Sequence, residues 1–362
     1  MKKKIVLVMV VALILIVEAA KADFTFGEPI NLGPPVNSQY YEDGANISAD
    51  GLELYFISPQ PGGPGDFELF DIYVATRSDV DANWSEPVNL GLTVNSANND
   101  SGPSISSDGL LLYFSSTRSG GHGDDDLWVT TRTAISEPWG SPVNLGSTVN
   151  SSAWDFDPSI SSDGLELYFT SNRAGSYGFV DIWVTTRETI EDDWSEPVNL
   201  GAVVNSTTFT QTPSISADGL ILFFESDRTG GVGVNDIWMT KRATTNGSWG
   251  EPVCLGQPVN SSGYEKMPDI SADGRILYFG HFDDVDGPWD LWQASIEPVV
   301  DLNADGIIDA ADVCIVVDNW GTDNQLCDVG PMPWGDGIVD VQDLIVLAEH
   351  LFEEFPPVES TE

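Results

Sequence analysis

The fold is decided by a short stretch at residues 159–169, which reads SISSDGLELYF. Its S-x-D-G core is a tight-turn signal between two segments that read as β-strands. The motif occurs five times, at spacings of 58, 55, 55 and 55 residues, and internal repeats of this length set the architecture. The five copies are residues 48–51, 106–109, 161–164, 216–219 and 271–274.

Each repeat predicts four strands. In the third copy a short strand at residues 158–160 precedes the turn, and an alternating strand follows it at 165–169. A Gly-rich loop then leads to a third strand at 181–187 and a fourth at 196–201. Four strands in one repeat are typical of a propeller blade, so the sequence predicts an all-β, five-bladed β-propeller over residues 23–299 without helices.

The two ends of the repeat region complement each other. Residues 26–33 form a fourth strand with no blade before it, whereas the last copy lacks a clean fourth strand of its own. Pro29 precedes Asn37 by the same 8 residues that separate the equivalent pair in every other copy. We therefore expect the N-terminal strand to complete the last blade and close the ring, which removes an exposed sheet edge.

The repeats resemble those of a known family. The S-x-D-G turns, followed by L-Y-F-x-S and D-I-W, are similar to the WD-repeat-like propeller repeats of the periplasmic TolB type. The resemblance covers the repeat region and implies the fold. It leaves the function open, because such propellers mostly act as binding platforms.

The N-terminus predicts a signal peptide over residues 1–22. Lysines at positions 2–4 precede an apolar run over 5–17, and Ala20-Lys21-Ala22 fits a cleavage site. The apolar run is too short to span a bilayer comfortably and no second one follows. We therefore expect a secreted or cell-surface protein that is not embedded in the membrane.

The chain is strongly acidic, with 57 Asp and Glu against 14 Lys and Arg and a net charge of −43 at pH 7. Cleavage of the predicted signal peptide removes four lysines and one glutamate, which takes the charge to −46. Such a charge repels nucleic acid and anionic membranes, and it suits calcium, cationic partners or neutral polymers. The 12 Trp, 16 Phe and 9 Tyr argue against disorder.

An oxygen-rich loop follows the repeats at residues 301–312, before a predicted helix at 313–320. Oxygen-bearing side chains occupy loop positions 1, 3, 5, 9 and 12, and a glycine occupies position 6. Calcium takes six to eight oxygens, and this spacing wraps one loop around the ion. The alternative is an Asp-rich solvated linker. The predicted ligands are Asp301, Asn303, Asp305, Ile307 through its carbonyl, Asp309 and Asp312.

A second loop, before a predicted helix at residues 344–352, repeats the last eight positions of the first. Its positions 1 and 3 are Met332 and Trp334, which offer no hard oxygen. Either an expanded loop brings Asp328 and backbone carbonyls to the ion, or this site binds calcium weakly. The predicted ligands of this second site are Asp336, Ile338, Asp340 and Asp343.

Two loop–helix units in tandem resemble a type I dockerin, a module that attaches an exported protein to a cohesin on a scaffold or cell surface. The resemblance implies a dockerin-like calcium-binding domain over residues 300–355, before a tail at 356–362, and a cohesin-like partner. Loop positions 10 and 11 help dockerins to recognise the cohesin. Here they are residues 310–311 and 341–342, which lack the hydroxyl groups common in that family, so the partner's identity does not carry over.

The three cysteines have structural roles in our interpretation. Cys314 and Cys327 flank the link between the two predicted helices. A disulfide between them would stabilise a small module in an oxidising compartment, and the sequence leaves this pairing open. Cys254 replaces an asparagine of the other copies and is expected to be a small buried thiol.

Two adjacent positions in each copy are expected to ring one mouth of the central channel, because the first strand of a blade lines it. Aromatic rings stack on sugars, carboxylates accept hydrogen bonds from hydroxyl groups, and a ring of carboxylates could hold a cation. Alternatively, a repeat makes its loops alike without any ligand. The positions hold Tyr41, Asn99, Trp154, Phe209 and Tyr264, followed by Glu42, Asp100, Asp155, Thr210 and Glu265.

Two further repeated sets are expected to be structural. In three blades an arginine precedes the D-I-W carboxylate by eight residues, which predicts an ion pair that closes the intervening loop. The tryptophans beside these carboxylates are expected to pack between blades. The sets are Arg118, Arg173 and Arg228; Asp71, Asp126, Asp181, Asp236 and Asp290; and Trp128, Trp183, Trp238 and Trp292.

The leading interpretation is a non-catalytic exported protein that docks through its calcium-loaded tail and binds a glycan or protein at the channel mouth. Hydrolysis needs a general acid beside a second carboxylate, usually where a repeat loses its symmetry. No blade shows such an outlier except at Asn99 and Thr210, which lose a carboxylate. The alternatives are a polysaccharide-degrading glycoside hydrolase, since some five-bladed propellers are glycosidases, and a cell-surface structural propeller with only protein partners.

Overall fold

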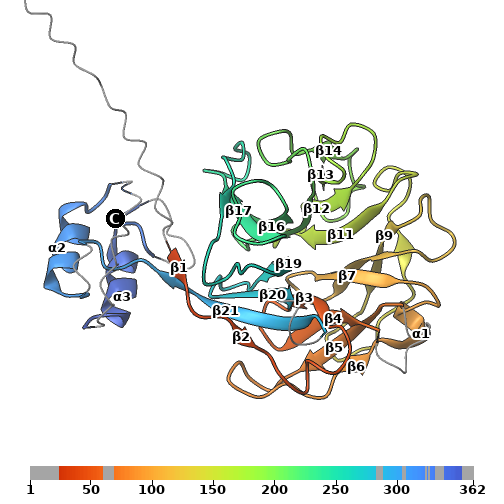
Figure 1. Cartoon of the computed structure of the whole chain (residues 1–362), viewed down its shortest axis with the longest axis horizontal. Helices are drawn as coiled ribbons and strands as arrows, with labels where there is room; N and C mark the ends of the chain where they lie inside the picture. The colour runs from red at the N-terminus through yellow and green to blue at the C-terminus, as the bar shows by residue number, and fades with distance from the viewer. Residues whose placement is uncertain are drawn as a thin grey trace, which may run out of the picture.

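Five antiparallel sheets surround a central channel, and each sheet is one blade (Figure 1). The predicted five-bladed all-β propeller with four-stranded blades is confirmed. The structure is a computed structural model, and the residues that it describes are 24–59, 69–282, 288–303, 307–322, 324, 327–330 and 338–352. The predicted signal peptide lies outside these residues.

The first two blades each contain four consecutive strands in simple up-and-down order. The first comprises β3 (Asp43–Ile47), β4 (Glu53–Ser58), β5 (Asp71–Thr76) and β6 (Val88–Asn89), and the second comprises β7 (Asp100–Ile105), β8 (Leu111–Ser116), β9 (Asp126–Thr131) and β10 (Val143–Asn144).

The third and fourth blades repeat this order. The third comprises β11 (Asp155–Ile160), β12 (Glu166–Ser171), β13 (Asp181–Thr186) and β14 (Val198–Asn199), and the fourth comprises β15 (Thr210–Ile215), β16 (Ile221–Ser226), β17 (Asp236–Lys241) and β18 (Val253–Cys254).

The fifth blade draws on both ends of the repeat region. Asn31 of β2 pairs antiparallel with Trp292 of β21, where the other blades have their own fourth strand. Phe24 of β1 pairs with Pro298, further along β21. The strands are β19 (Tyr264–Ile270), β20 (Ile276–Phe282), β21 (Asp290–Pro298), β1 (Phe24–Phe26) and β2 (Ile30–Asn31).

The S-x-D-G motif folds as predicted into the turn between the first and second strands. In the third blade, Gly164 N–H donates to the Ser161 carbonyl at 2.8 Å, and the Ser161 hydroxyl donates to Asp163 at 2.6 Å. Gly164 has a φ of +72°, a conformation that glycine adopts without a steric penalty. The turn therefore needs the motif's serine, aspartate and glycine together.

The apolar core lies between neighbouring blades. Buried Tyr55 and Ile72 of the first blade, for example, pack in one cluster with Leu112 and Phe114 of the second. Trp128 joins this cluster and is 8% exposed, and Trp183 and Trp238 occupy the same place in the next two clusters. The predicted packing role of these tryptophans is confirmed.

A ring of hydrogen bonds joins the five first strands around the channel. In each blade, the backbone N–H of the isoleucine that ends the first strand donates a hydrogen bond to the preceding blade. The acceptor is the polar side chain one position before that blade's own isoleucine. The ring closes between the last and first blades, where Ile47 N–H donates to Asp269. The five pairs are Ile105 to Asn46, Ile160 to Ser104, Ile215 to Ser159, Ile270 to Ser214 and Ile47 to Asp269, at 2.7–3.1 Å.

One helix interrupts the predicted all-β region. The single-turn helix α1 (Gly91–Val94) follows the fourth strand of the first blade, where a helical period is absent from the sequence. A helix of four residues is too short to leave such a period. The fourth strands are also shorter than predicted, since β14 contains only two residues.

Two helices follow the propeller, α2 (Ala310–Asp318) and α3 (Val341–Glu349). Both begin three residues before the predicted positions. Asp309 and Asp340 are the N-caps, and each forms a capping box with the aspartate three residues later, so the oxygen-rich loops themselves start the helices. Among the described residues, no helix combines the length and apolar character needed to cross a membrane.

All three cysteines are free thiols in the structure. Cys314 is exposed and Cys327 is buried, so the disulfide considered between them is not formed. Cys254 is half-buried, and the amide of Asn260 lies 3.2 Å from its sulfur, where the other blades have an asparagine oxygen.

Candidate functional site

The first strands share an unusual backbone conformation where they line the channel. One residue in each strand has a positive φ, between +48° and +58°, and three of the five are not glycine. Positive φ is uncommon for residues with a Cβ, and such residues are concentrated at functional sites. The five residues are Gly44, Gly102, Asp157, Thr212 and Met267.

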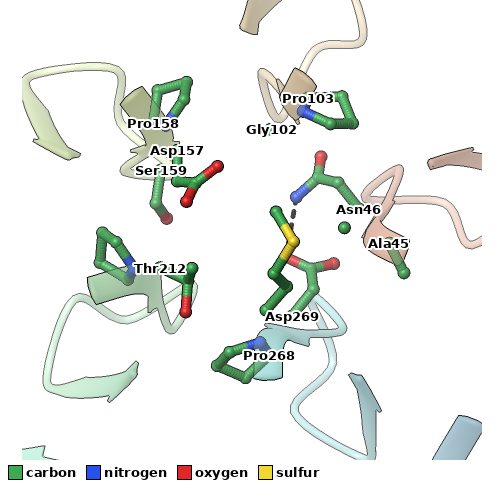
Figure 2. A pocket seen from close by; sticks show the side chains of 13 residues that line it. Ala45, Asn46, Gly102, Pro103, Asp157, Pro158, Ser159, Thr212, Pro268 and Asp269 are labelled. Atoms are coloured by element: carbon green, nitrogen blue, oxygen red, sulfur yellow. Dashed lines mark hydrogen bonds between the residues drawn. The ribbon is translucent and has the colours of Figure 1, made fainter. Parts of the chain in front are cut away.

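These residues surround a small cavity of about 30 Å³ at the centre of the channel. Figure 2 shows side chains from different blades pointing toward its middle, with Asp157 and Thr212 from neighbouring blades on one side and Asp269 from the fifth blade on the other. The carboxylate of Asp157 lies against Gly102, where a Cβ would come within 2.6 Å of its oxygen. Glycine at position 102 therefore makes room for Asp157.

Four charged side chains from four blades form the channel cluster, which we define as Asp43, Asp157, Glu225 and Lys266. The Lys266 ammonium lies 2.5 Å from the Asp43 carboxylate and 3.6 Å from the centre of the Trp289 ring. Three of the four are almost completely buried, with Asp43 4%, Asp157 9% and Glu225 1% exposed. One ammonium group therefore faces three carboxyl groups in a desolvated site.

Polar side chains of the fourth blade hold Glu225 in place. Gln211 donates to its Oε1 at 3.0 Å, and Asn235 donates to the same oxygen. The Thr212 hydroxyl lies 3.5 Å from Oε2. These contacts fix the orientation of the carboxyl group: Oε1 is held by Gln211 and Asn235, and Oε2 faces Thr212 and the channel.

Burial dominates the protonation of the cluster. Together with smaller contributions it raises the pKa of Glu225 to about 7, with the charge of Lys266 opposing the shift and the charge of Asp43 adding to it. Burial also raises the pKa of Asp157 to about 7, with Glu225 and Asp43 adding to the shift. Both groups therefore hold a proton up to near-neutral pH, unlike ordinary carboxylates.

Lys266 keeps its charge despite its surroundings. Burial alone would lower its pKa, but the charge of Asp43 and its hydrogen bond, followed by the charges of Glu225 and Asp157, raise the pKa above the usual value. Asp125 borders the cluster from the second blade. Burial, then Asp157 and Asp126, raise its pKa to about 8, and its Oδ1 has no hydrogen-bond partner among the described residues.

The expectation that no blade gains a carboxylate at an outlying position is wrong. The outlying acids lie one to two residues beyond the mouth positions along the first strand, and in the second strand. At each position one blade carries an acid that the others lack. The other blades have Ser101, Phe156, Gln211 and Lys266 for Asp43; Gly44, Gly102, Thr212 and Met267 for Asp157; and Ile57, Ser115, Thr170 and Gly280 for Glu225.

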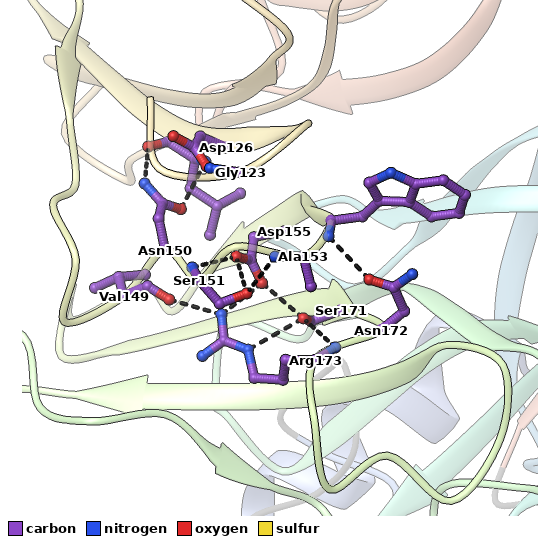
Figure 3. Close-up of polar contacts among 12 residues, drawn as sticks. Gly123, Asp126, Val149, Asn150, Ser151, Ala153, Asp155, Ser171, Asn172 and Arg173 are labelled. Atoms are coloured by element: carbon purple, nitrogen blue, oxygen red, sulfur yellow. Dashed lines mark hydrogen bonds and ion pairs between the residues drawn. The ribbon is translucent and has the colours of Figure 1, made fainter. Parts of the chain in front are cut away.

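Every side chain at the second of the two predicted mouth positions is completely buried and bonded within its own blade. Asp155 is typical (Figure 3): it pairs with Arg173 at 2.5 Å and accepts hydrogen bonds from the Ser171 hydroxyl and from Ser151. Its equivalents are Glu42, which binds Ser38 and Ser58; Asp100, which binds Arg118; Thr210, which binds Arg228; and Glu265, which binds His281 and Ser261.

The aromatic mouth residues differ from the acids because they reach the surface. Tyr41, Trp154 and Phe209 are 46%, 40% and 38% exposed, and Tyr264 is half-buried. Trp154, Phe209 and Tyr264 each form a bridge to the preceding blade, at Asp125, Val180 and Asn235. They therefore lie beside the residues that border the channel cluster.

The predicted pairing of the D-I-W carboxylates with arginine is wrong. Arg118 and Arg173 pair with the mouth acids Asp100 and Asp155. The D-I-W carboxylates accept hydrogen bonds from the loop before them instead, as Asp181 does from the N–H groups of residues 177 and 178. The D-I-W carboxylate is 8 residues from the arginine and the mouth acid is 18 residues from it, so the partner nearer in sequence is not the partner in space.

In the first predicted calcium loop, Asp312 is fully buried and ties the loop ends together. It accepts hydrogen bonds from the N–H groups of Leu302, Asn303 and Asp309 at 2.8, 3.2 and 2.9 Å. Residues that follow position 1 are thus held beside position 12, which suits an oxygen-only chelating loop. Asp305 lies outside the described residues. Among those that the structure describes, this loop included, no three His, Cys, Asp or Glu side chains form a group that could hold a metal ion.

The second loop has the same connection. The fully buried Asp343 accepts from the N–H groups of Val329 and Gly330 at 2.6 and 2.8 Å. These residues follow Asp328 as Leu302 and Asn303 follow Asp301, so Asp328 occupies the place of loop position 1. Asp336 lies outside the described residues, as do Met332 and Trp334.

Comparisons with known proteins find similarity among solved structures. No family model matches this sequence, and no curated protein matches it either. TolB from Acinetobacter baumannii is similar over 76% of this chain and 64% of its own length, with a TM-score of 0.44 and 13% identity. A putative TolB from Agrobacterium tumefaciens is similar over 77% and 86%, with a TM-score of 0.45 and 19% identity.

Glycosidase structures share the same architecture. The catalytic domain of the GH62 α-L-arabinofuranosidase of Coprinopsis cinerea is similar over 76% of this chain and 96% of its own length, with a TM-score of 0.50 and 13% identity. At these identities the similarity establishes a five-bladed β-propeller and nothing about chemistry.

Proposed function

We propose that this propeller is a glycoside hydrolase whose active site is the channel cluster. The observation that carries the proposal is the desolvated group of Asp43, Asp157 and Glu225 around Lys266, at positions where the repeat loses its symmetry. Glycoside hydrolysis requires two carboxyl groups with opposite protonation states. Environments that separate the protonation of neighbouring carboxyl groups identify such a pair. This replaces the non-catalytic function favoured by the sequence analysis.

Glu225 is the general acid in this proposal. Its raised pKa of about 7 keeps it protonated below neutral pH, and Gln211 and Asn235 orient it. As the glycosidic C–O bond breaks, Glu225 transfers its proton to the departing oxygen. The oxygen of a water molecule joins the anomeric carbon, and the proton that this water releases goes to the Asp43 carboxylate.

Asp43 is the basic partner. Its ion pair with Lys266, at 2.5 Å, stabilises the carboxylate in a site from which water is largely excluded. Asp157 lies in electrostatic contact with both groups and, when it ionises, raises the energy of a negative charge on Glu225. Lys266 is a positioning residue that acts through Asp43.

The fold supports this proposal in one respect. A propeller of the same architecture is the catalytic domain of an α-L-arabinofuranosidase, so this scaffold accommodates glycosidase chemistry. The substrate, by contrast, is inferred from charge: with 57 acidic against 14 basic residues, the chain suits a neutral glycan.

The test is turnover of neutral polysaccharides and aryl glycosides by the whole chain and by Glu225→Gln and Asp43→Asn. We expect the wild type to release reducing sugars and each variant to lose 10²- to 10⁴-fold in kcat. Glu188→Gln is the matched control, because Glu188 is exposed and lies outside the channel cluster. Turnover by Glu225→Gln equal to that of the wild type, or no turnover by the wild type, contradicts the proposal.

We further propose that the chain is exported by its N-terminal signal peptide and that residues 300–355 form a calcium-binding, dockerin-like module that docks to a cohesin-like partner. The matching capping boxes at Asp309 and Asp340, and the equivalent bonds of Asp312 and Asp343, support a duplicated loop. Asp301, Asn303, Asp309 and Asp312 would hold the first ion, with Asp305, and Asp328 would supply position 1 of the second site.

We also propose that β2 closes the propeller ring. Its pairing with β21 supplies the fourth strand of the last blade, and hydrogen bonds from Asn31 to Asp290 and from Asn37 to the Leu291 carbonyl reinforce that contact. An uncovered β21 would expose an unpaired sheet edge.

A further inference from the structure

We propose that an aromatic arc beside the channel cluster binds an extended neutral polysaccharide chain. The arc is defined by Trp154, Phe179, Phe209, Val234 and Tyr264, from the third, fourth and fifth blades. The inference deepens the proposed function and rests on it for the link to catalysis, although its binding test does not depend on turnover.

The arc is continuous from Trp154 to Phe209. Phe179 stands between these two rings, with ring centroids 6.1 and 5.1 Å away. At the next junction Val234 takes the place of Phe179, and its N–H donates to the carbonyl of Gly263, which precedes Tyr264. Phe179 and Val234 are 55% and 50% exposed, so both junctions present apolar side chains to solvent.

The second blade interrupts the aromatic position of the repeat. Four blades have an aromatic residue there, including the exposed Tyr41 of the first blade, whereas the second blade has Asn99. The position of Phe179 likewise holds Asp124 in the second blade. The mouth is therefore polar at the second blade and aromatic at this position in the other four.

The arc is joined directly to the proposed active site. Trp154 pairs with Asp125, whose carboxyl group borders the channel cluster, and Tyr264 pairs with Asn235, which donates to Glu225. Tyr264 also contacts Trp289 at 5.7 Å, and the Lys266 ammonium lies over that ring. The arc therefore lies one residue away from the side chains that contact Glu225 and border the channel cluster.

The chemistry of the arc selects a neutral polymer. Aromatic and aliphatic side chains offer their faces to the C–H surfaces of sugar rings, and the amide and carboxyl groups of the opposite side accept or donate hydrogen bonds to hydroxyl groups. The net charge of −43 repels polyanionic glycans. Successive rings of the arc are tilted by 65° and 46°, which favours a twisted chain over a flat ribbon.

Affinity electrophoresis of the whole chain in gels containing soluble arabinoxylan, xyloglucan or polygalacturonate tests the inference. We expect at least one neutral polymer to retard the wild type, polygalacturonate to leave it unretarded, and Trp154→Ala with Phe209→Ala to weaken the retention at least tenfold. Trp320→Ala is the matched control, because Trp320 is 50% exposed on the C-terminal segment and lies outside the arc.

The outcomes separate the two proposals. Retention that is lost in the arc variant but accompanied by no hydrolysis supports the arc and overturns the proposed enzyme. Hydrolysis by a wild type whose retention is unchanged in the arc variant overturns the arc alone. Equal retention by polygalacturonate overturns the assignment of a neutral ligand. Circular dichroism of each variant ensures that lost retention reflects the surface and not unfolding.

Discussion

The Lys266 ammonium of the fifth blade lies 2.5 Å from the Asp43 carboxylate of the first blade, across the junction where the last repeat meets the first. Both residues lie on innermost strands, β19 and β3. The other blades have no equivalent of this pair: their residues at the same positions are Ser101, Phe156 and Gln211. The pair therefore marks the place where sequence divergence created a charged site in a repeated scaffold.

Replacing Lys266 with methionine removes the only cation of the channel cluster. Because Lys266 lowers the pKa of Glu225, its loss raises that pKa further, and Glu225 stays protonated to higher pH. We expect kcat/KM to fall 10- to 100-fold, and the basic limb of its pH profile to move upward by at least half a pH unit. Lys266→Arg should restore most of the activity and the original limb. A uniform loss of rate with an unmoved limb would show that Lys266 is only structural.

Stability should depend on pH through the buried carboxyl groups. Burial raises the pKa values of Asp157, Glu225 and Asp269 to about 7, above those in an unfolded chain. Between about pH 4 and pH 7 the folded chain therefore binds more protons than the unfolded chain, so the free energy of unfolding falls as pH rises through this window. We expect a decrease of at least about 1.4 kcal/mol from pH 5 to pH 8 in urea unfolding.

Asp269→Asn isolates one contribution to this dependence. Asp269 lies outside the proposed catalytic groups, where it accepts from Asn46 and from the Ile47 N–H. An amide does not titrate, so the decrease between pH 5 and pH 8 should become smaller even if the variant is less stable at both values. Glu188→Gln, at an exposed site, should leave the slope unchanged. An identical slope in Asp269→Asn and the wild type would show that Asp269 does not contribute.

Most of the propeller could be predicted from the sequence, because the S-x-D-G turn is a local structure with a local cause. Ser161, Asp163 and Gly164 form hydrogen bonds with each other within four residues, so the motif predicts the same turn wherever it occurs. The starts of α2 and α3, at the N-caps Asp309 and Asp340, were harder to predict from the sequence. They depend on capping boxes that use the same aspartates as the loops, which the prediction had assigned to calcium alone.

The channel cluster was harder to predict because its acids stand close to acids that recur in most of the repeats. Asp155 and Asp157 are two residues apart, yet Asp155 pairs with Arg173 within the blade whereas Asp157 faces Glu225 across the channel. Only the fold determines which of them is structural. Comparison of the copies position by position would have separated them, since an acid recurs at Asp155 in four blades and occurs once at Asp157.

Removal of residues 24–33 should destabilise the last blade. The deletion takes away β1 and β2, exposes the edge of β21 and uncovers Ile296, which is 3% exposed in a core cluster with Phe24. We expect the melting temperature to fall by at least about 4 °C and the truncated chain to aggregate on heating, as unpaired edges do. Deletion of residues 353–362 is the control for truncation. A truncated N-terminus with an unchanged melting temperature would show that β2 does not close the ring.

Calcium should bind twice, and Asp301 and Asp328 should each control one ion. Asp312 and Asp343 hold the residues that follow these aspartates in the same way, which places both carboxylates at loop position 1. Titration calorimetry of the whole chain should give two calcium ions, the second weaker because Gly330 replaces the position-3 side chain. Asp301→Ala should remove the tighter ion and Asp328→Ala the weaker one, whereas Asp318→Asn, exposed on α2, should keep both. A single ion that is insensitive to Asp328→Ala would confine calcium to the first loop, and no heat at all would leave both loops as helix caps only.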